Sequence, residues 1–435
     1  MNYDNIQTRR EFVRNLLFLT AGGTAPFFLT RTVLALDRTV SAAGTKSIPG
    51  IPDDRILIVV QMGGGNDGLN MVVPFAMDEY YRARTNLGVP ADSVLKLNDT
   101  IGLHPKLDKL KGLYDAGNMA VVQGVGYPNP DRSHFRSMEI WQTGDPQSRT
   151  TEYGWLGSYL DNACPGCDPK MRRMNPVAGV NVGGWMPVAL KSKKGLSVAL
   201  ESPDSFRWIP ISDQANDAQK AETTFERLNR IVTRDLGDPR VARLDFLSRV
   251  AMNAQLSSDR VHEVTKKYHG GATYPGSGLA RQLQMVAKMI AGGLDTRIYY
   301  VSMGGFDTHA NQKGAHERLL TELGEGVAAF YDDLKKQGND GRVLMMTFSE
   351  FGRRVSENAS GGTDHGSGAP LFVFGSRIKP GVYGNHPGLA AGDLDRGDVK
   401  FHTDFRSVYA TLLENWLGAK SQPILGADFK KLAFV

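Results

Sequence analysis

Short apolar runs that end in glycine or polar residues recur along the chain. Residues 56–60 are all apolar, and residues 61–67 then read Gln-Met-Gly-Gly-Gly-Asn-Asp. A continuous apolar run of this length predicts a strand buried on both faces, as in a parallel sheet. The same pattern predicts further strands over 119–122, 297–303, 342–348 and 371–374.

Apolar residues at helical spacing lie between these runs. Leu283, Val286 and Ile290 would share one face of a helix. We predict helices over 105–116, 279–294, 317–337 and 405–417. Asp404 is placed to cap the last of them, and His316, next to the third, is expected at the surface.

The alternation of strands and helices predicts an α/β fold with a mostly parallel central sheet flanked by helices. Residues 145–278 break this alternation with a Gly/Pro-rich part, 163–210, followed by helical segments. We therefore expect a large insertion or cap over the sheet within a single domain, 55–435.

The N-terminus has the pattern of an export signal. Arg9, Arg10 and Phe12 precede a modestly apolar run over 16–29. This run is shorter than the roughly 20 apolar residues of a membrane span. The arginine pair resembles the twin-arginine type of signal, which a receptor recognises.

We therefore expect a signal peptide over 1–43 and a linker over 44–54. Cleavage could follow Ala35 or Ala43. The expected partner is the twin-arginine translocation machinery, the expected location is periplasmic or extracellular, and no transmembrane segment is expected in the mature chain. The alternative, an amphipathic helix packed on the domain, is disfavoured because the apolar run has no polar face.

Composition and charge exclude some classes of protein. The chain has 435 residues, of which 41% are apolar and 22% charged, and a net charge of +5. This small, dispersed excess disfavours a nucleic-acid-binding protein, which would need a basic stripe. Its two cysteines, Cys164 and Cys167, are expected to form a disulfide that closes a local loop. A redox motif is the alternative, but no suitable helix start follows Cys167.

Acidic residues and histidines follow the predicted strands. These residues are Asp67, Asp307, His309, Glu350 and His365. Ligands of open parallel sheets bind beyond the carboxyl ends of the strands, so this pattern predicts a divalent metal site there. Imidazole and carboxylate ligands suit zinc best, with manganese, iron or calcium as alternatives.

A candidate nucleophile follows the second predicted strand. Ser133 stands in the sequence Pro-Asp-Arg-Ser-His-Phe-Arg-Ser. A serine hydroxyl that a metal deprotonates can attack a phosphorus or sulfur ester. Arg132, His134 and Arg136 are candidates for binding the anionic substrate, since arginine pairs with such groups bidentately.

Several of these residues also have a purely structural interpretation. Asp67 could cap the following turn or helix, and Ser133 could cap the helix after it. Glu350 could form a surface ion pair with Arg353 or Arg354. Their joint occurrence at strand ends nevertheless favours a functional site.

These segments, in this order, resemble the family called domain of unknown function 1501 (DUF1501) over nearly the whole chain. The motifs that carry the resemblance are Gly-Gly-Asn-Asp-Gly, Ser-His-Phe-Arg-Ser-Met-Glu-Ile-Trp-Gln-Thr-Gly, Phe-Asp-Thr-His, Ser-Glu-Phe-Gly-Arg and Asp-His-Gly. More distantly the chain resembles the alkaline phosphatase and sulfatase superfamily. That resemblance implies a parallel-sheet fold, two metals held at the strand-end acids and histidines, and Ser133 as nucleophile.

Two departures from the superfamily pattern bear on the site. Only Thr308 separates Asp307 from His309, where the superfamily usually has three residues. Phe351 stands where a ligand histidine is expected. The resemblance therefore implies an incomplete two-metal site.

We expect an exported metal-dependent hydrolase of phosphate or sulfate esters that acts on an anionic ester or glycan. The alternative is a catalytically inactive scaffold that binds a glycan or a partner protein in the cell envelope. For this second class, the aromatic residues of the insertion could form a sugar-binding surface, namely Trp155, Trp185 and Trp208 with Tyr153 and Tyr159.

Overall fold

The computed structural model describes residues 51, 54–147, 152–162, 175, 177–202, 257–258, 260–268 and 270–435. The expected signal peptide, most of the expected linker, and Cys164 and Cys167 lie outside these residues and stay predictions. In the described part of the chain, no helix is long and apolar enough to cross a membrane.

A central sheet organises the described residues. It has nine strands among them, in the order β11-β5-β10-β9-β1-β8-β6-β7, with β14 also paired to β5. The strands are β1 (Ile56–Met62), β5 (Met119–Gly126), β6 (Gly179–Val182), β7 (Ser197–Leu200), β8 (Ile298–Met303), β9 (Val343–Phe348), β10 (Ala369–Phe374), β11 (Gly381–Tyr383) and β14 (Thr403–Asp404). The five predicted strands are confirmed, each within a few residues of its expected bounds.

The strand directions bring several loops to one edge of the sheet. β1 is parallel to β8 and β9. β10 is antiparallel to both β9 and β5, so β5 runs in the same direction as β9. The carboxyl ends of β1, β5, β8 and β9 therefore meet the amino end of β10, and we call this side the carboxyl edge.

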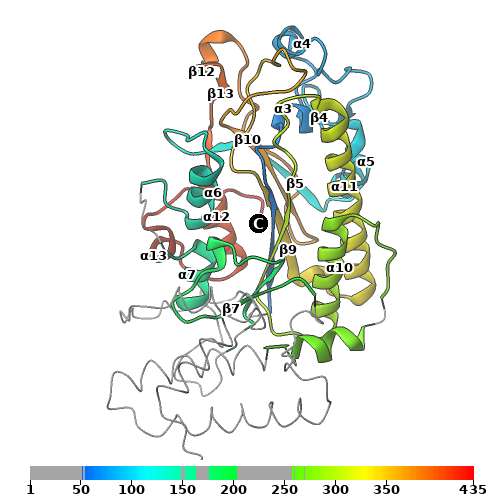
Figure 1. Ribbon diagram of the computed structural model, residues 1–435, viewed down its shortest axis with the longest axis vertical. Helices are drawn as coiled ribbons and strands as arrows, with labels where there is room; N and C mark the ends of the chain where they lie inside the picture. The colour runs from blue at the N-terminus through cyan, green and yellow to red at the C-terminus, as the bar shows by residue number, and fades with distance from the viewer. Residues whose placement is uncertain are drawn as a thin grey trace, which may run out of the picture.

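Two layers of helices cover the sheet (Figure 1). One face carries α5 (Asp108–Asp115), α10 (Gly278–Ala291) and α11 (Gln312–Gln337). The other carries α6 (His134–Thr143), α7 (Trp155–Asn162), α12 (Phe405–Thr411) and α13 (Gln422–Leu425). The predicted helices are confirmed, although 405–417 divides into α12 and a π-helical turn, Leu412–Trp416. Asp404 caps α12 by accepting from Arg406 N at 2.9 Å.

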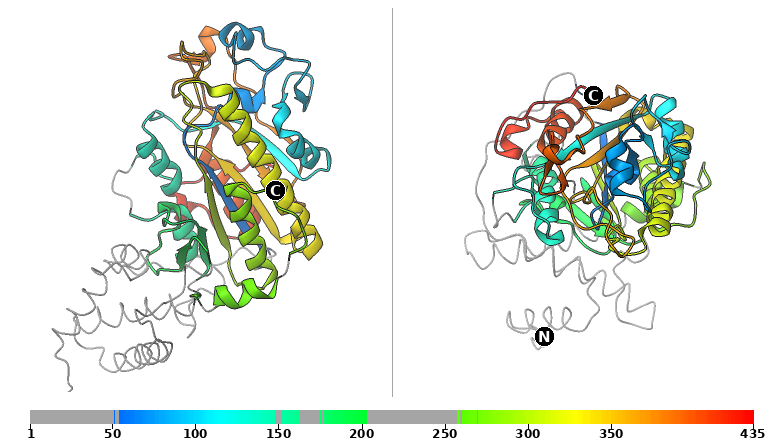
Figure 2. Two further views of the ribbon diagram at one scale, coloured as in Figure 1. Left: turned by 45° about the vertical axis from the view of Figure 1, so that its right-hand side comes forward. Right: turned by 90° about the horizontal axis from the view of Figure 1, so that it is seen from above.

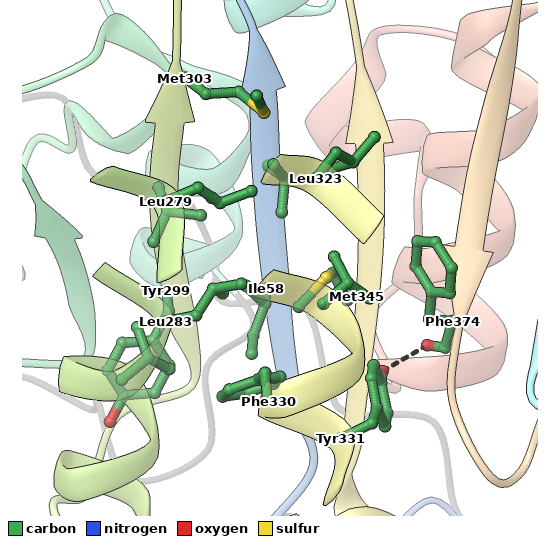
Figure 3. Close-up of a cluster of buried hydrophobic side chains, with 14 of the residues drawn as sticks. Ile58, Leu279, Leu283, Tyr299, Met303, Leu323, Phe330, Tyr331, Met345 and Phe374 are labelled. Carbon is green, nitrogen blue, oxygen red and sulfur yellow. Dashed lines mark hydrogen bonds between the residues drawn. The ribbon is translucent and has the colours of Figure 1, made fainter. Parts of the chain in front are cut away.

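Burial on both faces explains the continuous apolar runs of the strands. Ile58 belongs to the core beneath α10 and α11, whereas Leu57 and Val59 belong to the core on the other face. Figure 3 shows Ile58 among Leu283 and Leu323 from these two helices. A strand with both faces buried has no polar alternation, and this is why the period of two is absent from the sequence.

The stretch expected to be an insertion or cap, 145–278, is partly a continuation of the sheet. β6 pairs in parallel with β8, and β7 extends the sheet beyond it. These strands are only four residues each and lie in a Gly/Pro-rich context, so their signal in the sequence is weak. Residues 203–256 lie outside the described part of the chain.

Smaller elements form a third cluster beyond the end of β1. They surround a separate core that includes Tyr80, Val94 and Leu389, and Figure 2 shows this end of the molecule from two further directions. The elements are α3 (Gly68–Met71), α4 (Asp78–Ala83), β2 (Val72–Val73), β3 (Leu95–Lys96), β4 (Gly102–Leu103), β12 (Leu394–Asp395) and β13 (Asp398–Val399). Short 3-10 turns occur at Pro105–Leu107, Val188–Leu190, Asp340–Arg342 and Ala391–Asp393.

Candidate metal centre

Two loops and one helix bring histidines and an aspartate together at the carboxyl edge. Asp307 and His309 follow β8, His365 precedes β10, and His134 opens α6 after β5. One donor atom from each of His134, Asp307 and His365 lies within 4.8 Å of the others. The structure therefore unites three of the five predicted ligands and adds His134, which was expected to bind substrate.

The donor atoms of this cluster are close enough to share one ion. His365 Nε2 and His309 Nε2 each lie 3.1 Å from Asp307 Oδ1. The two nitrogens are 2.9 Å apart, and His134 Nε2 is 3.4 Å from Asp307 Oδ2. Ligands that each lie about 2.1 Å from one ion are roughly 3–4 Å from one another, so the spacing fits.

Every histidine of the cluster has its Nδ1 atom bound to an oxygen. Glu350 Oε1 lies 2.8 Å from Nδ1 of His134, and Asp364 Oδ1 lies 3.2 Å from Nδ1 of His309. The carbonyl oxygen of Arg132 lies 2.9 Å from Nδ1 of His365. Since carboxylate and carbonyl oxygens can only accept, each Nδ1 donates, and Nε2 is the atom of each ring that is left to face Asp307.

This arrangement requires a positive charge at the centre. Two nitrogen lone pairs and a carboxylate oxygen face one another within 3.1 Å at His309, His365 and Asp307. In addition, Nε2 of His134 is buried and has no hydrogen-bond partner among the described residues. Either a proton on an imidazole or a metal ion can satisfy such a set. In metal centres, a ligating histidine usually donates the N–H of its other ring nitrogen to an oxygen in this way.

Arg353 sets the electrostatics of Asp307. Its buried guanidinium donates to Asp307 Oδ1 at 2.7 Å and to the carbonyl oxygens of Phe306 and Thr363. Burial raises the pKa of Asp307, but the hydrogen bond and charge of Arg353, together with the imidazoles of His365 and His134, outweigh this and lower the pKa to about 2. Asp307 is therefore an anion across the physiological range.

Glu350 lies behind His134 and not on the surface. The alternative interpretation, a surface ion pair with Arg353 or Arg354, does not apply because Glu350 is buried. Its Oε1 accepts from Gly64 N at 2.8 Å as well as from His134, and its Oε2 accepts from Ser349 Oγ at 3.1 Å. Glu350 thus orients a candidate ligand instead of joining the cluster.

Gly64 explains the glycine run after β1. Its φ is +121°, and a Cβ there would lie 2.4 Å from the backbone nitrogen of Asp307. Only glycine allows the β1 loop to pass this closely while its N–H reaches Glu350.

Asp67 lies in a buried ion pair next to the site. It caps α3 by accepting from Asn70 N at 3.3 Å, as its structural interpretation predicted. Arg84 donates to its Oδ2 at 2.6 Å, and Gln312 donates to the same oxygen. Burial raises the pKa of Asp67, but the charge and hydrogen bond of Arg84 outweigh this and lower it. With these partners the structure does not bring Asp67 into the cluster.

Gln312 connects Asp67 to both loops of the cluster. Its Oε1 accepts from Thr308 Oγ1 at 3.0 Å and from Thr363 Oγ1 at 2.6 Å. Thr308 lies between Asp307 and His309, and Thr363 lies two residues before His365. The buried amide therefore holds the two ligand-bearing loops at a fixed separation.

Ser133 and the two arginines predicted to bind substrate differ in their placement. Ser133 is exposed at the N-cap of α6, next to His134, and its side chain makes no capping hydrogen bond. Arg132 instead donates to Asp398 at 2.9 Å, and Arg136 to Glu139 at 2.8 Å and to Pro146 O. Both guanidinium groups are therefore bound to other protein groups, and neither takes the substrate-binding place that the sequence predicted.

Phe351 forms an apolar wall of the site. Its ring centroid lies 4.9 Å from that of His134 and 4.7 Å from that of His365. A side chain without donor atoms thus packs beside two candidate ligands, which accords with one cluster of ligands among the described residues.

An open pocket of about 450 Å³ adjoins the cluster. Its lining includes His134, Asp307 and Glu350 as well as the apolar side chains of Phe135, Met138 and Val188. The remaining lining comes from Gln61, Gly63, Gly64, Glu139 and Gln142. A small molecule can therefore reach the donor atoms.

The sequence contained a signal for only some of the functional residues that were missed. His134 follows a predicted strand just as Ser133 does, so the strand-end rule could have included it among the ligands. Arg84 and Gln312 gave no such signal, because each is polar in an ordinary helical or loop context. His316 was expected at the surface but is 2% exposed, with its Nε2 2.9 Å from Asn66 Oδ1.

The chain is similar to solved structures of the superfamily that its motifs resemble. The sulfatase PsFucS1 from Pseudoalteromonas sp. is 13% identical, with 87% of this chain and 70% of that chain covered and a TM-score of 0.35. An alkaline phosphatase superfamily protein from Vibrio parahaemolyticus is 10% identical, with 93% and 78% covered and a TM-score of 0.35. Alkaline phosphatase from the Antarctic bacterium TAB5 is 12% identical, with 76% and 94% covered and a TM-score of 0.30.

These similarities are distant, and the roles proposed below rest on this chain's own residues. A comparison with curated protein sequences finds no match. The family described as "protein of unknown function (DUF1501)" matches residues 54–419, which include every residue of the cluster. The chain therefore belongs to the DUF1501 family.

Proposed function

We propose that this protein is a metal-dependent hydrolase of phosphoric or sulfuric esters. The observation that carries the proposal is the convergence of three Nε2 atoms on Asp307, with every Nδ1 bound to an oxygen. Three imidazoles and one carboxylate suit zinc, manganese or iron better than calcium, which prefers oxygen ligands alone.

His134, Asp307, His309 and His365 would hold the ion. When bound, a divalent ion supplies a Lewis acid that stabilises charge developing on the ester. The chain prepares this site in advance, because Glu350 fixes the ring of His134 and Arg353 keeps Asp307 ionised. Asp67 and Glu350, first predicted as ligands, act in this proposal as positioning residues.

Ser133 is the proposed nucleophile. Its hydroxyl is exposed beside His134, at the start of a ten-residue helix. The N-terminus of α6 favours negative charge, which helps an anionic ester to approach there. Attack by its oxygen would break the bond between the phosphorus or sulfur and the alcohol oxygen, so that the alcohol leaves with the serine proton and the phosphoryl or sulfuryl group is esterified to Ser133. Water would then hydrolyse this ester and restore the serine hydroxyl.

Activity after metal removal and replacement tests the proposal. The protein is stripped with a chelator, supplied with zinc, manganese or iron in turn, and assayed on phenyl phosphate and phenyl sulfate. We expect activity to vanish and return, and Asp307→Asn to lower kcat/KM by at least about 100-fold. Asp332→Asn, on an exposed ion pair of α11, is the matched control. Unchanged activity in chelated protein would overturn the proposal.

Mass spectrometry tests the role of Ser133. A trapped phosphoryl or sulfuryl group on the peptide that contains Ser133 is expected during turnover, and Ser133→Ala should abolish both the adduct and the activity. Full activity of Ser133→Ala would assign the attack to water.

The scaffold alternative receives less support from the aromatic residues. Trp155 and Tyr159 are buried in the core, Trp208 lies outside the described residues, and Trp185 is 62% exposed. A scaffold predicts glycan binding that Trp185→Ala weakens and Ser133→Ala leaves unchanged.

A further inference from the structure

The residues that line the pocket beside the cluster indicate which esters the pocket can accept. Its charged lining residues are Glu139, Asp307 and Glu350, all acidic. The arginines nearby are already bound: Arg136 to Glu139, and Arg353 beneath Asp307. Among the described lining residues, none offers a cation to a substrate.

The charges of the whole site lead to the same conclusion. Asp364 adds a further carboxylate behind His309. Arg354 acts on Asp364, and Asp398 pairs with Arg132 and Arg354 behind the cluster. Five carboxylates and four guanidinium groups thus leave the site with one net negative charge. A divalent ion would change this to one positive charge, which a singly charged ligand balances, whereas a second charge on the ligand adds repulsion from the carboxylates.

Part of the pocket lining is apolar. Phe135 is 91% exposed although it is a large aromatic residue. Met138 lies three positions further along α6, on the same helical face, and Val188 completes this wall. An exposed aromatic side chain at the rim of a pocket is a ready surface for a ring.

Two glutamine amides of the pocket lining are held in place by hydrogen bonds. Gln61 Oε1 accepts from Gln142 Nε2 at 2.9 Å and from the hydroxyl of Tyr300 at 2.5 Å. Gln142 Oε1 accepts from Val188 N at 2.8 Å. These fixed amides and the ring of Phe135 together fit an uncharged ring with polar substituents.

We infer that the pocket selects esters with a single negative charge, such as sulfate monoesters or phosphodiesters, whose alcohol carries an uncharged ring that packs on Phe135. Phosphate monoesters, which carry two charges above pH of about 6, are discriminated against. The inference rests on the proposed function and names the substrate class of the same site.

Binding of unreactive analogues tests the charge preference without turnover. Phenylmethanesulfonate and benzylphosphonate share one shape, but at about pH 9 the phosphonate carries two charges and the sulfonate one. Calorimetry on the metal-loaded protein should show the sulfonate bound at least about tenfold more tightly. Equal binding, or tighter binding of the phosphonate, overturns the inference.

Two variants test the origin of this preference. Glu139→Gln removes one carboxylate of the pocket and should lower the ratio of sulfonate affinity to phosphonate affinity by about threefold or more. Asp115→Asn removes a carboxylate at the end of α5, shortly before β5 begins at the opposite edge, and should leave the ratio unchanged. Equal effects of the two variants overturn the electrostatic explanation.

Phe135→Ala tests the ring surface, and the exposure of Phe135 makes a folding defect unexpected. The variant should bind phenylmethanesulfonate about tenfold more weakly and should bind methanesulfonate as tightly as the wild type does. A monosaccharide sulfate serves as a second ligand, and the larger loss identifies an aryl or a sugar ring as the natural one. No loss for either ring overturns this part of the inference.

The outcomes separate the two proposals. Hydrolysis of phosphate monoesters in preference to sulfates and diesters would refute the inference and leave the hydrolase intact. The predicted binding preference without hydrolysis of any ester would refute the hydrolase alone.

Discussion

His134 shows at the residue scale how a ligand is prepared. Its Nδ1 lies 2.8 Å from a buried carboxylate, so the ring is fixed and Nε2 faces Asp307. The same carboxylate accepts from Gly64 N, which ties the β1 loop to the same point. A carboxylate that is bound to the other nitrogen of a ligating histidine increases the basicity of the ligand and limits the rotation of its ring.

Glu350→Gln is expected to weaken metal binding by about 10–100-fold without displacing the ion completely. The amide keeps the shape of the side chain but loses the charge that holds the His134 proton. A competition titration with a chromogenic chelator measures the change. Glu414→Gln, at a remote partly buried glutamate bound to Ser421 and Lys431, is the control and should bind metal as wild type does.

Asp67 is expected to contribute to stability instead of metal binding. Its side chain and that of Arg84 are fully buried, so Asp67→Asn leaves a buried guanidinium without its counter-ion. The free energy of unfolding should fall by about 3–5 kcal/mol, as measured by denaturant titration, while metal stoichiometry stays the same. Lost metal with unchanged stability would instead make Asp67 a ligand.

At the scale of elements, the direction of β10 completes the cluster. β10 runs antiparallel to β9, so the loop before it, and not the loop after it, reaches the carboxyl edge with His365. β8 delivers Asp307 and His309 from its carboxyl end, and α6 delivers His134. The site thus forms where strands of both directions meet.

The elements differ in how far the sequence alone could predict them. The buried strands β1, β8 and β9 have continuous apolar runs, which only a strand covered on both faces tolerates. β6 and β7 were missed, because four residues in a Gly/Pro-rich stretch carry little pattern. The direction of β10 could not be predicted either, since an apolar run has the same pattern whichever way the strand runs in the sheet. The partnership of Asp67 with Arg84 depends on tertiary packing that spacing does not encode.

The buried histidine of α11 makes stability depend on pH. Burial lowers the pKa of His316 from 6.5 to about 4, and burial together with His316 lowers the pKa of His104 to about 4. Unfolded chains bind these protons more readily, so this contribution is present above pH 6.5 and is lost as the pH falls toward 4. We expect a decrease of up to about 3 kcal/mol for His316.

Denaturant unfolding between pH 7 and pH 4, with a chelator present so that metal release does not contribute, measures this effect. His316→Gln should flatten the profile. The same slope in the variant would show that other groups control the acid sensitivity.

At the scale of the whole molecule, the twin arginines predict export of a folded chain. Arg9→Lys with Arg10→Lys keeps the charge but removes the recognised pair, so the full-length protein should stay unprocessed in the cytoplasm. Cell fractionation and N-terminal sequencing check this. Arg14→Lys is the matched control and should be exported, and export of the double variant at the same level would refute the assignment.

Metal content of the purified protein tests the central claim most directly. The full chain, produced in its native compartment or loaded with zinc, manganese or iron, is analysed by elemental mass spectrometry together with Asp307→Asn and the control Asp332→Asn. The cluster predicts about one ion per chain in the wild type and the control, and far less in Asp307→Asn. Wild-type protein that binds none of these ions, or an Asp307→Asn variant that binds as much as wild type, would contradict the metal centre.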